Sequence, residues 1–316
     1  MTKMFCVGDD WQSIYRFAGS NMRLFYKFEE YFGFTAHRKI ERTYRFSNPL
    51  LNISSEFIQR NPEQVKKSVT PFVTPMPKPR NDKNCQIKLI SIDGVDYPYH
   101  EDEIPMVQEW IKRNHTYIDF VDCGASLKDN DNLMFQPVQK LVKSIPADES
   151  ILILGRYNYD AFSIGYVFNT SGPNSNPDNI FVTIEGRKIR FMSVHSAKGL
   201  EASNCYLVNV SVNSYPSAKA IANGTEAIEE DRRCLYVAMT RAKDSLVIYR
   251  TQFAAQTFAP GSAVDGFNID CGEQYFLNNL PANLYNPEYI SDGLRHWDEY
   301  KGGGITLADT DDFDFS

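Results

Sequence analysis

The sequence lacks any long apolar segment. Although 42% of its 316 residues are hydrophobic, no stretch approaches the roughly 18 consecutive apolar residues that a membrane span requires. The first residues, MTKMFCVGDD, reach two aspartates too early for the apolar core of a secretory signal. The sequence therefore predicts a soluble, cytoplasmic protein with no membrane partner, long enough for one large domain or two ordinary ones.

Closely spaced cysteines are also missing. The chain has six cysteines, and no two of them form a CxxC pair. This spacing argues against a zinc site and against a disulfide scaffold, so we expect reduced thiols and no metal site within the chain. The cysteines are Cys6, Cys85, Cys123, Cys205, Cys234 and Cys271.

Positive charge is not in excess, because 33 Lys and Arg stand against 40 Asp and Glu, a net charge of -7. This balance is a weak argument against a protein that packages nucleic acid, yet a protein that tracks along DNA needs only a local basic groove. The last residues, ADTDDFDFS, are acidic and are expected to be disordered in isolation. There is no repeat at solenoid spacing.

Apolar periodicity alternates between strand and helix along most of the chain. This alternation predicts an α/β fold with a mostly parallel sheet and helices on both faces. Residues 69–83 hold four prolines and are predicted to be an extended linker. Strands are predicted at residues 3–8, 36–40, 85–92, 150–156, 189–193, 205–210 and 244–250, and helices at 21–32, around 50–57 with Ser47 as N-cap, 101–113, 134–145, 159–168 and 227–241.

A polar, glycine-bounded loop, GDDWQSIYRFAGS, follows the first predicted strand. Ligands of open parallel sheets bind beyond the carboxyl ends of strands, so this loop is a site candidate. The Gln12 amide can donate to a phosphate oxygen and accept from a water, and the rings of Tyr15 and Phe17 offer faces on which unpaired bases could stack. The structural alternative is that these aromatic residues belong to the core.

Four blocks in order resemble motifs three to six of the UvrD, Rep and PcrA group of superfamily 1 DNA helicases, and they look most like the helicase IV branch. The blocks are VGDDWQSIYRFAG, IERTYRFSNPL, MSVHSAKGLEASNCYLVNV and EEDRRCLYVAMTRAKDSLVIY. The resemblance implies a RecA-like second motor domain, a P-loop NTPase fold without the P-loop-bearing first domain. Two departures are Phe17, where many relatives have tryptophan, and Ala18, where many have arginine.

The block TYRFS carries the first predicted nucleotide contacts. An arginine presents a planar, permanently charged fork that suits a phosphate whose negative charge grows during transfer. Arg45 is therefore the candidate arginine finger, and Tyr44 resembles the family tyrosine that stacks on adenine. The alternative is a core tyrosine beside a surface arginine.

The segment HSAKGLE combines small and polar residues. Gly199 lets the backbone approach a ligand closely, and Glu201 offers a carboxylate to a ribose hydroxyl. His195 and Lys198 could bind DNA phosphates, although a lone histidine is more often structural. The segment is not a Walker A motif, because GxxxxGK[ST] is absent from the chain.

The block EEDRRCLYVAMTRAK predicts an amphipathic helix that buries its apolar residues and turns its basic residues outward. Arg233 matches the family arginine that reaches the γ-phosphate of ATP, and Tyr236, Thr240 and Arg241 resemble the DNA-proximal end of the block. The alternative is a solvated helix with i,i+4 pairs such as Glu229 with Arg233. Arg232, Arg241 and Lys243 are secondary phosphate candidates.

The resemblance implies that the phosphate loop and the magnesium-binding acids of such a motor precede the first block. ATP with Mg²⁺ would then be shared with an upstream P-loop domain in the same or another chain, and this chain alone should not hydrolyse ATP. It could be a truncated piece, one half of a split helicase, or a degenerate relative. The predicted parts are a first-domain remnant (1–35), the start of the second domain (36–74), linker and reduced insertion (75–150), the rest of the second domain (151–252) and a C-terminal extension (253–316).

The predicted function is therefore the C-terminal half of an ATP-dependent DNA helicase or translocase that acts on single-stranded or partly duplex DNA. Movement from 3′ to 5′ is implied by the resemblance alone. The alternative is a non-catalytic module that binds single-stranded DNA or a repair complex.

Overall fold

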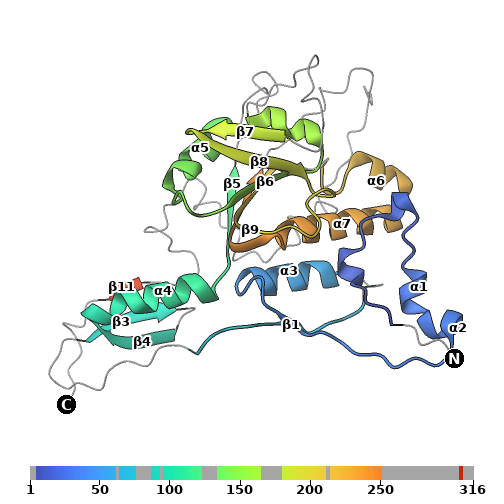
Figure 1. Ribbon diagram of the computed structural model, residues 1–316, viewed down its shortest axis with the longest axis horizontal. Coiled ribbons are helices and arrows are strands. Elements are labelled where there is room, and N and C mark those ends of the chain that lie inside the picture. The colour runs from blue at the N-terminus through green and yellow to red at the C-terminus, as the bar shows by residue number, and fades with distance from the viewer. Residues whose placement is uncertain are drawn as a thin grey trace.

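A six-stranded sheet lies at the centre of the computed structural model (Figure 1), in the order β5-β10-β9-β6-β8-β7. The structure describes residues 5–61, 64–75, 87–92, 95–122, 134–164, 180–210, 214–250 and 306–308. All neighbouring strands are parallel except the edge strand β7, which runs antiparallel to β8. The strands are β5 (Tyr117–Asp122), β6 (Ile151–Gly155), β7 (Ile180–Ile184), β8 (Arg187–Ser193), β9 (Ala202–Val210) and β10 (Ala242–Arg250).

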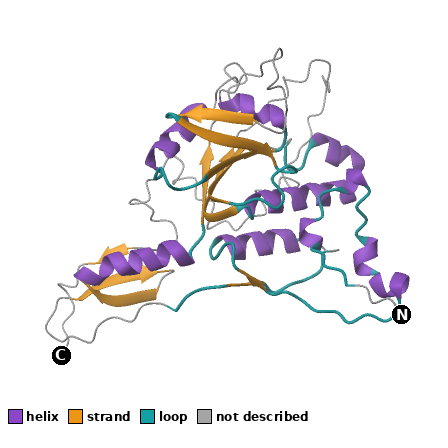
Figure 2. Cartoon of the chain, viewed as in Figure 1, coloured by secondary structure: helices purple, strands orange, loops and turns teal. Residues whose placement is uncertain are grey.

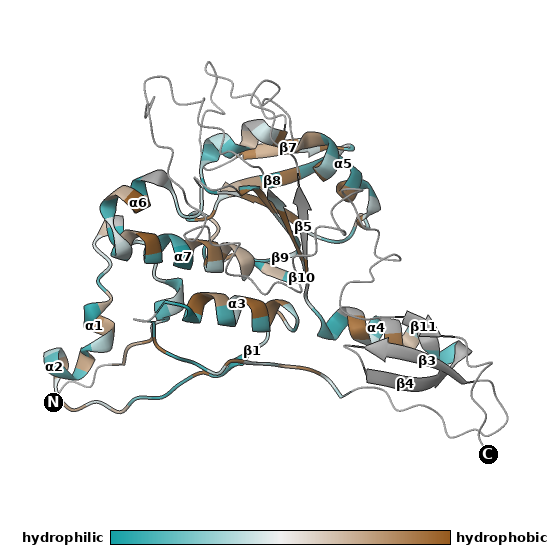
Figure 3. Cartoon of the chain, turned by 180° about the vertical axis from the view of Figure 1, so that it is seen from behind, coloured by the Kyte–Doolittle hydropathy of each residue, from teal (hydrophilic) through white to brown (hydrophobic). Residues whose placement is uncertain are grey.

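Alternating side chains divide the core between the two faces of this sheet. In β6, Leu152 and Leu154 point to one face and Ile153 points to the other; in β9, Leu207 joins the first face and Tyr206 the second. This is the two-residue period of a strand. Both faces are apolar because helices cover both (Figure 2), and the central strands are mostly coloured as hydrophobic in Figure 3.

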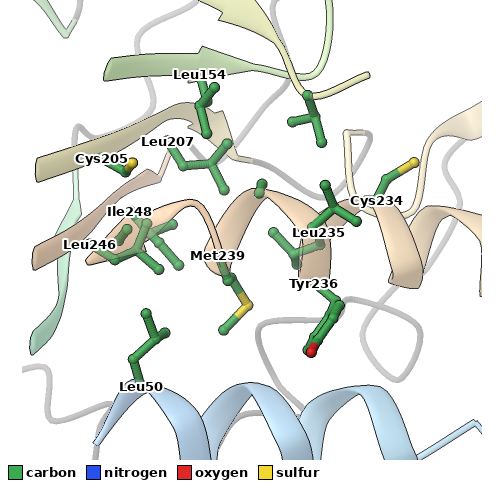
Figure 4. Close-up of a cluster of buried hydrophobic side chains, with 14 of the residues drawn as sticks. Leu50, Leu154, Cys205, Leu207, Cys234, Leu235, Tyr236, Met239, Leu246 and Ile248 are labelled. Atoms are coloured by element: carbon green, nitrogen blue, oxygen red, sulfur yellow. The ribbon is translucent and has the colours of Figure 1, made fainter. Parts of the chain in front are cut away.

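Helix α7 (Thr225–Met239) packs between the sheet and helix α3 (Leu50–Gln59). Tyr236 and Met239 point from α7 toward α3, where Leu50 faces them, while Leu154 and Leu207 reach the same cluster from the sheet (Figure 4). Helix α5 (Phe135–Ser144) and the 3-10 helix η5 (Asn158–Ile164) cover the opposite face.

The remaining elements surround this core. The segment before α3 holds four short helices, η1 (Asp10–Gln12), η2 (Arg16–Ala18), α1 (Arg23–Tyr26) and α2 (Phe28–Phe32). The strands β1 (Arg42–Thr43) and β2 (Thr70–Pro71) form a parallel pair. A separate three-stranded sheet contains β3 (Ile87–Ile92), β4 (Val95–His100) and β11 (Thr306–Ala308); η3 (Glu101–Glu103) and α4 (Ile104–Asn114) follow β4, and α6 (Ala218–Asn223) precedes α7.

The predicted fold class is confirmed, because the sheet is mostly parallel and the chain is mixed α/β. Several predicted elements differ. Residues 5–8 and 36–40 form no strand, since no described strand pairs with them, and the predicted helix 21–32 breaks at Lys27. Ser47 is not the N-cap of α3, because the helix begins after Pro49 without a side-chain cap. Of the predicted helix 159–168, the described part is a 3-10 helix.

The predicted insertion at 75–150 is not one unit. Strand β5 pairs in parallel with β10, and α5 packs in the core on the far face of the sheet. The prediction missed β5 because residues 117–122 alternate apolar and polar positions only briefly. It also missed β7, although the two-residue connection Glu185-Gly186, with positive φ at both residues, is typical of a β-hairpin. The loop predicted at 170–179 and nearly all of the extension at 253–316 lie outside the described residues.

Among the described residues, no helix combines the length and the apolar character needed to cross a membrane.

The central strand β6 provides a test of this core. Ile153 is fully buried, so Ile153→Ala should leave a cavity and lower the free energy of unfolding by about 2–5 kcal/mol. The measurement is urea unfolding followed by circular dichroism. Ile40, which is 81% exposed, gives the matched control, and Ile40→Ala should change stability by less than about 0.5 kcal/mol. Equal losses in the two variants would contradict the assignment of the core.

Candidate functional site

One face of α7 gathers three of the four sequence blocks. Arg233, Tyr236 and Thr240 are spaced three and four residues apart, which places them on one side of the helix. The Nε of Arg233 donates to the carbonyl oxygen of Ser13 at 2.7 Å, and the carbonyl oxygen of Thr240 accepts from Arg45 at 3.3 Å. These two contacts are about 10 Å apart along the helix.

The Gln12 loop is held against this face by its neighbours. Trp11 is buried and packs edge-on against the ring of Tyr236, with 5.6 Å between ring centroids. The amide nitrogen of Gln12 donates to Asp9 Oδ2 at 2.5 Å. Gln12 and Arg233 therefore belong to one local assembly, joined through Ser13.

Arg45 lies in a cluster of opposite charges at the other end of α7. Its Nε donates to Glu201 Oε2 at 3.0 Å, and Lys243 Nζ lies 2.6 Å from Glu201 Oε1. The hydrogen bonds from Lys243 and then Arg45 lower the pKa of Glu201. Glu201 and Lys243 stand at the amino ends of β9 and β10, so this cluster lies at the edge of the sheet opposite to the one that open parallel sheets normally use for ligands.

Tyr44, the residue before Arg45 in the sequence, presents an exposed aromatic surface. Its side chain is 73% exposed and stacks on Phe72, with 5.0 Å between centroids and 29° between planes. The parallel pairing of β1 with β2 brings the two rings together. Gly199 has φ +91° and no heavy atom within 4 Å of the place that a Cβ would occupy, so its backbone conformation, and not a close approach within the protein, explains the glycine.

Tyr15, His195 and Lys198 form a second group after the carboxyl end of β8. The hydroxyl of Tyr15 donates to the carbonyl oxygen of His195 at 2.8 Å, and Lys198 Nζ lies 4.9 Å from the centroid of the Tyr15 ring. The structure thus brings together three of the predicted DNA contacts. The side chain of Phe17, a fourth, lies outside the described residues.

The prediction that the basic residues of the block EEDRRCLYVAMTRAK point outward is wrong for its three arginines. Arg232, Arg233 and Arg241 are 8%, 7% and 0% exposed. Arg232 pairs with Glu229 at 2.8 Å, in place of the expected pair between Glu229 and Arg233. A helix packed on both sides has no wide solvated face, so each arginine finds a partner inside the protein.

Thr240 and Arg241 do not suit the predicted contact with DNA. The guanidinium of Arg241 donates to the carbonyl oxygens of Val237 and Leu200 and to the hydroxyl of Thr240, at 2.8–3.2 Å. The Thr240 hydroxyl in turn donates to the carbonyl oxygen of Tyr236 at 2.9 Å. Because both side chains are buried and their donors engaged, they are structural in this conformation.

A buried cluster around Arg156 was missed by the sequence analysis. Arg156 forms an ion pair with Asp231, contacts Cys234 Sγ at 3.4 Å and faces the ring of Tyr215. Burial works to lower the pKa of Arg156, but Cys234 and Asp231 outweigh it and the pKa is raised. Asp231 also accepts from the backbone and hydroxyl of Ser217, the N-cap of α6. Asp231 therefore ties α6 and α7 to the end of β6.

Residues 173–252 match the family model of the UvrD-like helicase C-terminal domain. The chain carries a UvrD-like helicase C-terminal domain. Within that match lie the HSAKGLE segment and the whole of α7, which the structure joins to Gln12 and Arg45.

Curated relatives of this helicase C-terminal domain are themselves DNA helicases. The chain is 28% identical to DNA helicase IV of Escherichia coli over 253 residues, which cover 77% of this chain and 28% of that protein. It is 37% identical to DNA helicase II of Salmonella typhimurium over 123 residues, which cover 39% of this chain and 16% of that protein. The matches thus span under a third of the length of either relative.

A solved structure, the C-terminal domain of a possible DNA helicase from Lactobacillus plantarum, is 17% identical and covers 45% of this chain and 78% of its own. Its TM-score of 0.29 is too low to support any argument about this helicase domain.

The Arg156 cluster gives His195 of the helicase domain an unusual titration. Burial, and next the charge of Arg156, lower the pKa of His195 to about 4, from an ordinary value of about 6.5. Between these values the unfolded chain binds a proton that the folded chain does not, so His195 costs stability as the pH falls from 6.5 to 4. Asp160 has the opposite effect on stability. Burial raises its pKa to about 6, so the stability that it contributes at low pH is lost as the pH rises from about 3.8 through 6.

We therefore expect His195→Gln to remove the acid-side loss that His195 causes. The free energy of unfolding of the variant minus that of the wild type should be larger at pH 4.5 than at pH 7.5. The reason is that only the wild type carries the histidine that resists protonation. The measurement is the free energy of unfolding in urea at the two pH values, with Asp160 unchanged in both proteins. A difference between variant and wild type that is the same at both pH values would contradict the assignment.

Proposed function

We propose that this chain supplies the nucleotide-sensing and DNA-contacting half of an ATP-dependent DNA helicase or translocase that moves from 3′ to 5′. The observation that carries the proposal is the convergence on α7. Segments near residues 13, 45 and 200 are far apart in sequence, yet all contact α7, which carries Arg233, or the residues just after it. The relatives with the same blocks are DNA helicases.

In the proposed ATP site, Gln12, Arg45 and Arg233 lie close to the γ-phosphate. Tyr44 stacks on the base and Glu201 contacts the sugar. The residues fit these roles in part. The Tyr44 ring is open to solvent, and the Arg45 side chain is 28% exposed beside Lys243. Arg233 and Glu201 are engaged by Ser13 and by two cations, so binding requires these contacts to rearrange or to be shared. When bound, ATP with Mg²⁺ supplies the phosphoryl group that is cleaved.

The Mg²⁺ ligands and the phosphate-binding loop belong, in this proposal, to an upstream P-loop domain. Exposed apolar side chains between residues 5 and 34 support the proposal that another protein domain binds there, because large apolar patches on a soluble protein usually mark contact surfaces. Helices α1 and α2 bury none of their residues. The exposed side chains are Phe5, Val7, Leu24, Phe25, Tyr26, Tyr31, Phe32 and Phe34.

Single-stranded DNA is proposed to cross the group formed by Tyr15, His195 and Lys198. A ring beside an ammonium group offers stacking to a base and a charge to a phosphate. The neutral form of His195, favoured by its lowered pKa, would act there as a hydrogen-bonding group and not as a cation. Such contacts bind the backbone without reading the sequence.

The arginine roles are tested by mixing this chain with a P-loop-bearing upstream fragment and measuring DNA-stimulated ATP hydrolysis. Arg45→Lys and Arg233→Lys should each lower turnover by about 10³-fold or more, because lysine loses the planar fork. Arg60, an exposed arginine paired with Glu56, provides the control, and Arg60→Lys should retain full turnover. Full turnover in both test variants would refute the finger assignment, and a mixture that binds DNA without hydrolysis would favour a non-catalytic binding module.

The DNA contacts are tested by fluorescence anisotropy with labelled oligo-dT at several salt concentrations. Lys198→Ala should weaken binding and reduce the slope of log affinity against log salt by about 1, as expected for one lost phosphate contact. Tyr15→Ala should cost about 1–3 kcal/mol if one base stacks on the ring. Lys188→Ala, on the β7–β8 hairpin, is the control for loss of one positive charge. An identical slope change in the control would indicate an effect of net charge alone.

A further inference from the structure

We infer that Lys67 is a positioning residue for Gln12, acting through Asp9, and that it fixes which end of the Gln12 amide faces the proposed γ-phosphate site. The inference rests on the proposed function, because it concerns what Gln12 does there. Lys67 lies outside all four blocks, between α3 and β2.

The Lys67 ammonium group is the centre of a compact set of contacts with η1. Its Nζ lies 2.8 Å from Asp9 Oδ1, contacts Asp10 Oδ1 and sits 5.0 Å from the centroid of the Trp11 ring. Its side chain is 20% exposed and that of Asp10 is fully buried. A partly buried cation between two carboxylates interacts more strongly than an exposed pair, because water screens it less.

The residues just before Lys67 complete the attachment. Asp10 Oδ2 accepts from Gln64 Nε2 at 2.5 Å and from the backbone nitrogen of Val65 at 3.2 Å. The indole nitrogen of Trp11 donates to the carbonyl oxygen of Val65 at 2.9 Å. The segment 64–67 thus holds the loop by backbone and side-chain contacts together.

Asp9 transmits this attachment to Gln12. Its Oδ1 binds Lys67 and also accepts from the backbone nitrogen of Trp11 at 3.1 Å, so the carboxylate is fixed in place. Its Oδ2 accepts from Gln12 Nε2 at 2.5 Å. A carboxylate accepts hydrogen bonds and donates none, so it selects the amide nitrogen of Gln12 over the amide oxygen.

The chemical consequence is a defined orientation of the Gln12 amide. With one N–H of its amide given to Asp9 Oδ2, Gln12 presents its carbonyl oxygen, which can accept a hydrogen bond from a water, while the second N–H of the amide stays available as a donor. In the proposed site, this orientation suits the Gln12 carbonyl oxygen to position the attacking water. In the absence of Lys67, the loop would lose the cation that fixes Asp9, and the amide could turn.

The test uses the DNA-stimulated ATPase of this chain mixed with a P-loop-bearing upstream fragment. Lys67→Met should lower kcat by about 100-fold while leaving KM for ATP unchanged, because small displacements of a catalytic group reduce the rate of the chemical step. Lys67→Arg should restore turnover, since a guanidinium can also bridge the two carboxylates. Lys66→Met is the matched control, because Lys66 is exposed and points to the carbonyl oxygen of Gln59.

A double-mutant cycle separates positioning from a general loss of stability. If Lys67 acts through Gln12, adding Lys67→Met to a Gln12→Ala background should lower kcat no further. Full turnover of Lys67→Met, or an equal loss in both backgrounds, would overturn the inference. Asp9→Asn, a milder change, should show the same dependence on Gln12 if Lys67→Met fails to fold.

The failure of this inference and that of the proposed function are distinguishable. If Arg45→Lys and Arg233→Lys abolish turnover but Lys67→Met does not, only the role of Lys67 is refuted. If none of the three variants matters, the proposed nucleotide site itself is wrong.

Discussion

The burial of α7 on both sides is the constraint on which the arrangement of the site depends. A helix covered by the sheet on one side and by α3 and η1 on the other must either lose its charges or neutralise them within the protein. Here they are kept: Arg232 pairs with Glu229, Asp231 with Arg156, and Arg233 with a backbone carbonyl oxygen. The partners of Asp231 and Arg233 come from other segments, so satisfying the charges of the helix also fixes the segments around it. Packing and site geometry are thus consequences of the same requirement.

This requirement also explains where the sequence was informative and where it was not. The strands β6, β9 and β10 could be predicted because both faces of each are buried, so long apolar runs mark them in the sequence. The short strands β1 and β2 could not, because their pairing depends on contacts between residues 28 positions apart. The motif residues were recognisable by resemblance, but their partners were not. Nothing in the local pattern around Lys67 or Arg156 indicates a carboxylate that lies 58 or 75 residues away in the chain.

The mistaken orientation of the basic residues has the same origin. An amphipathic interpretation places the charged side chains on a solvent-exposed face, which is correct only when one side of the helix is free. In α7 the charged residues cluster in its middle, and α3, α6, β9 and η1 all pack against this helix. An arginine can be buried at such a place because its five donors can be satisfied by backbone carbonyl oxygens, as Arg241 shows. When several charged residues cluster in a helix and the residues around them in sequence are strongly apolar, the pattern therefore indicates a buried network of ion pairs and hydrogen bonds more than a solvated face.

The charge cluster at the end of α7 sets a condition on any nucleotide that binds there. Arg45, Arg241 and Lys243 bring three positive charges to one region, where the carboxylate of Glu201 pairs with both Arg45 and Lys243. Burial, and next the charge of Arg45, lower the pKa of Arg241 to about 10, which indicates that these cations repel one another. An anion that approached Arg45 would relieve this repulsion, but it would compete with Glu201 for the same donors. A ligand of the proposed site must therefore carry enough negative charge to replace a carboxylate, as a triphosphate does; a neutral base and sugar alone would not.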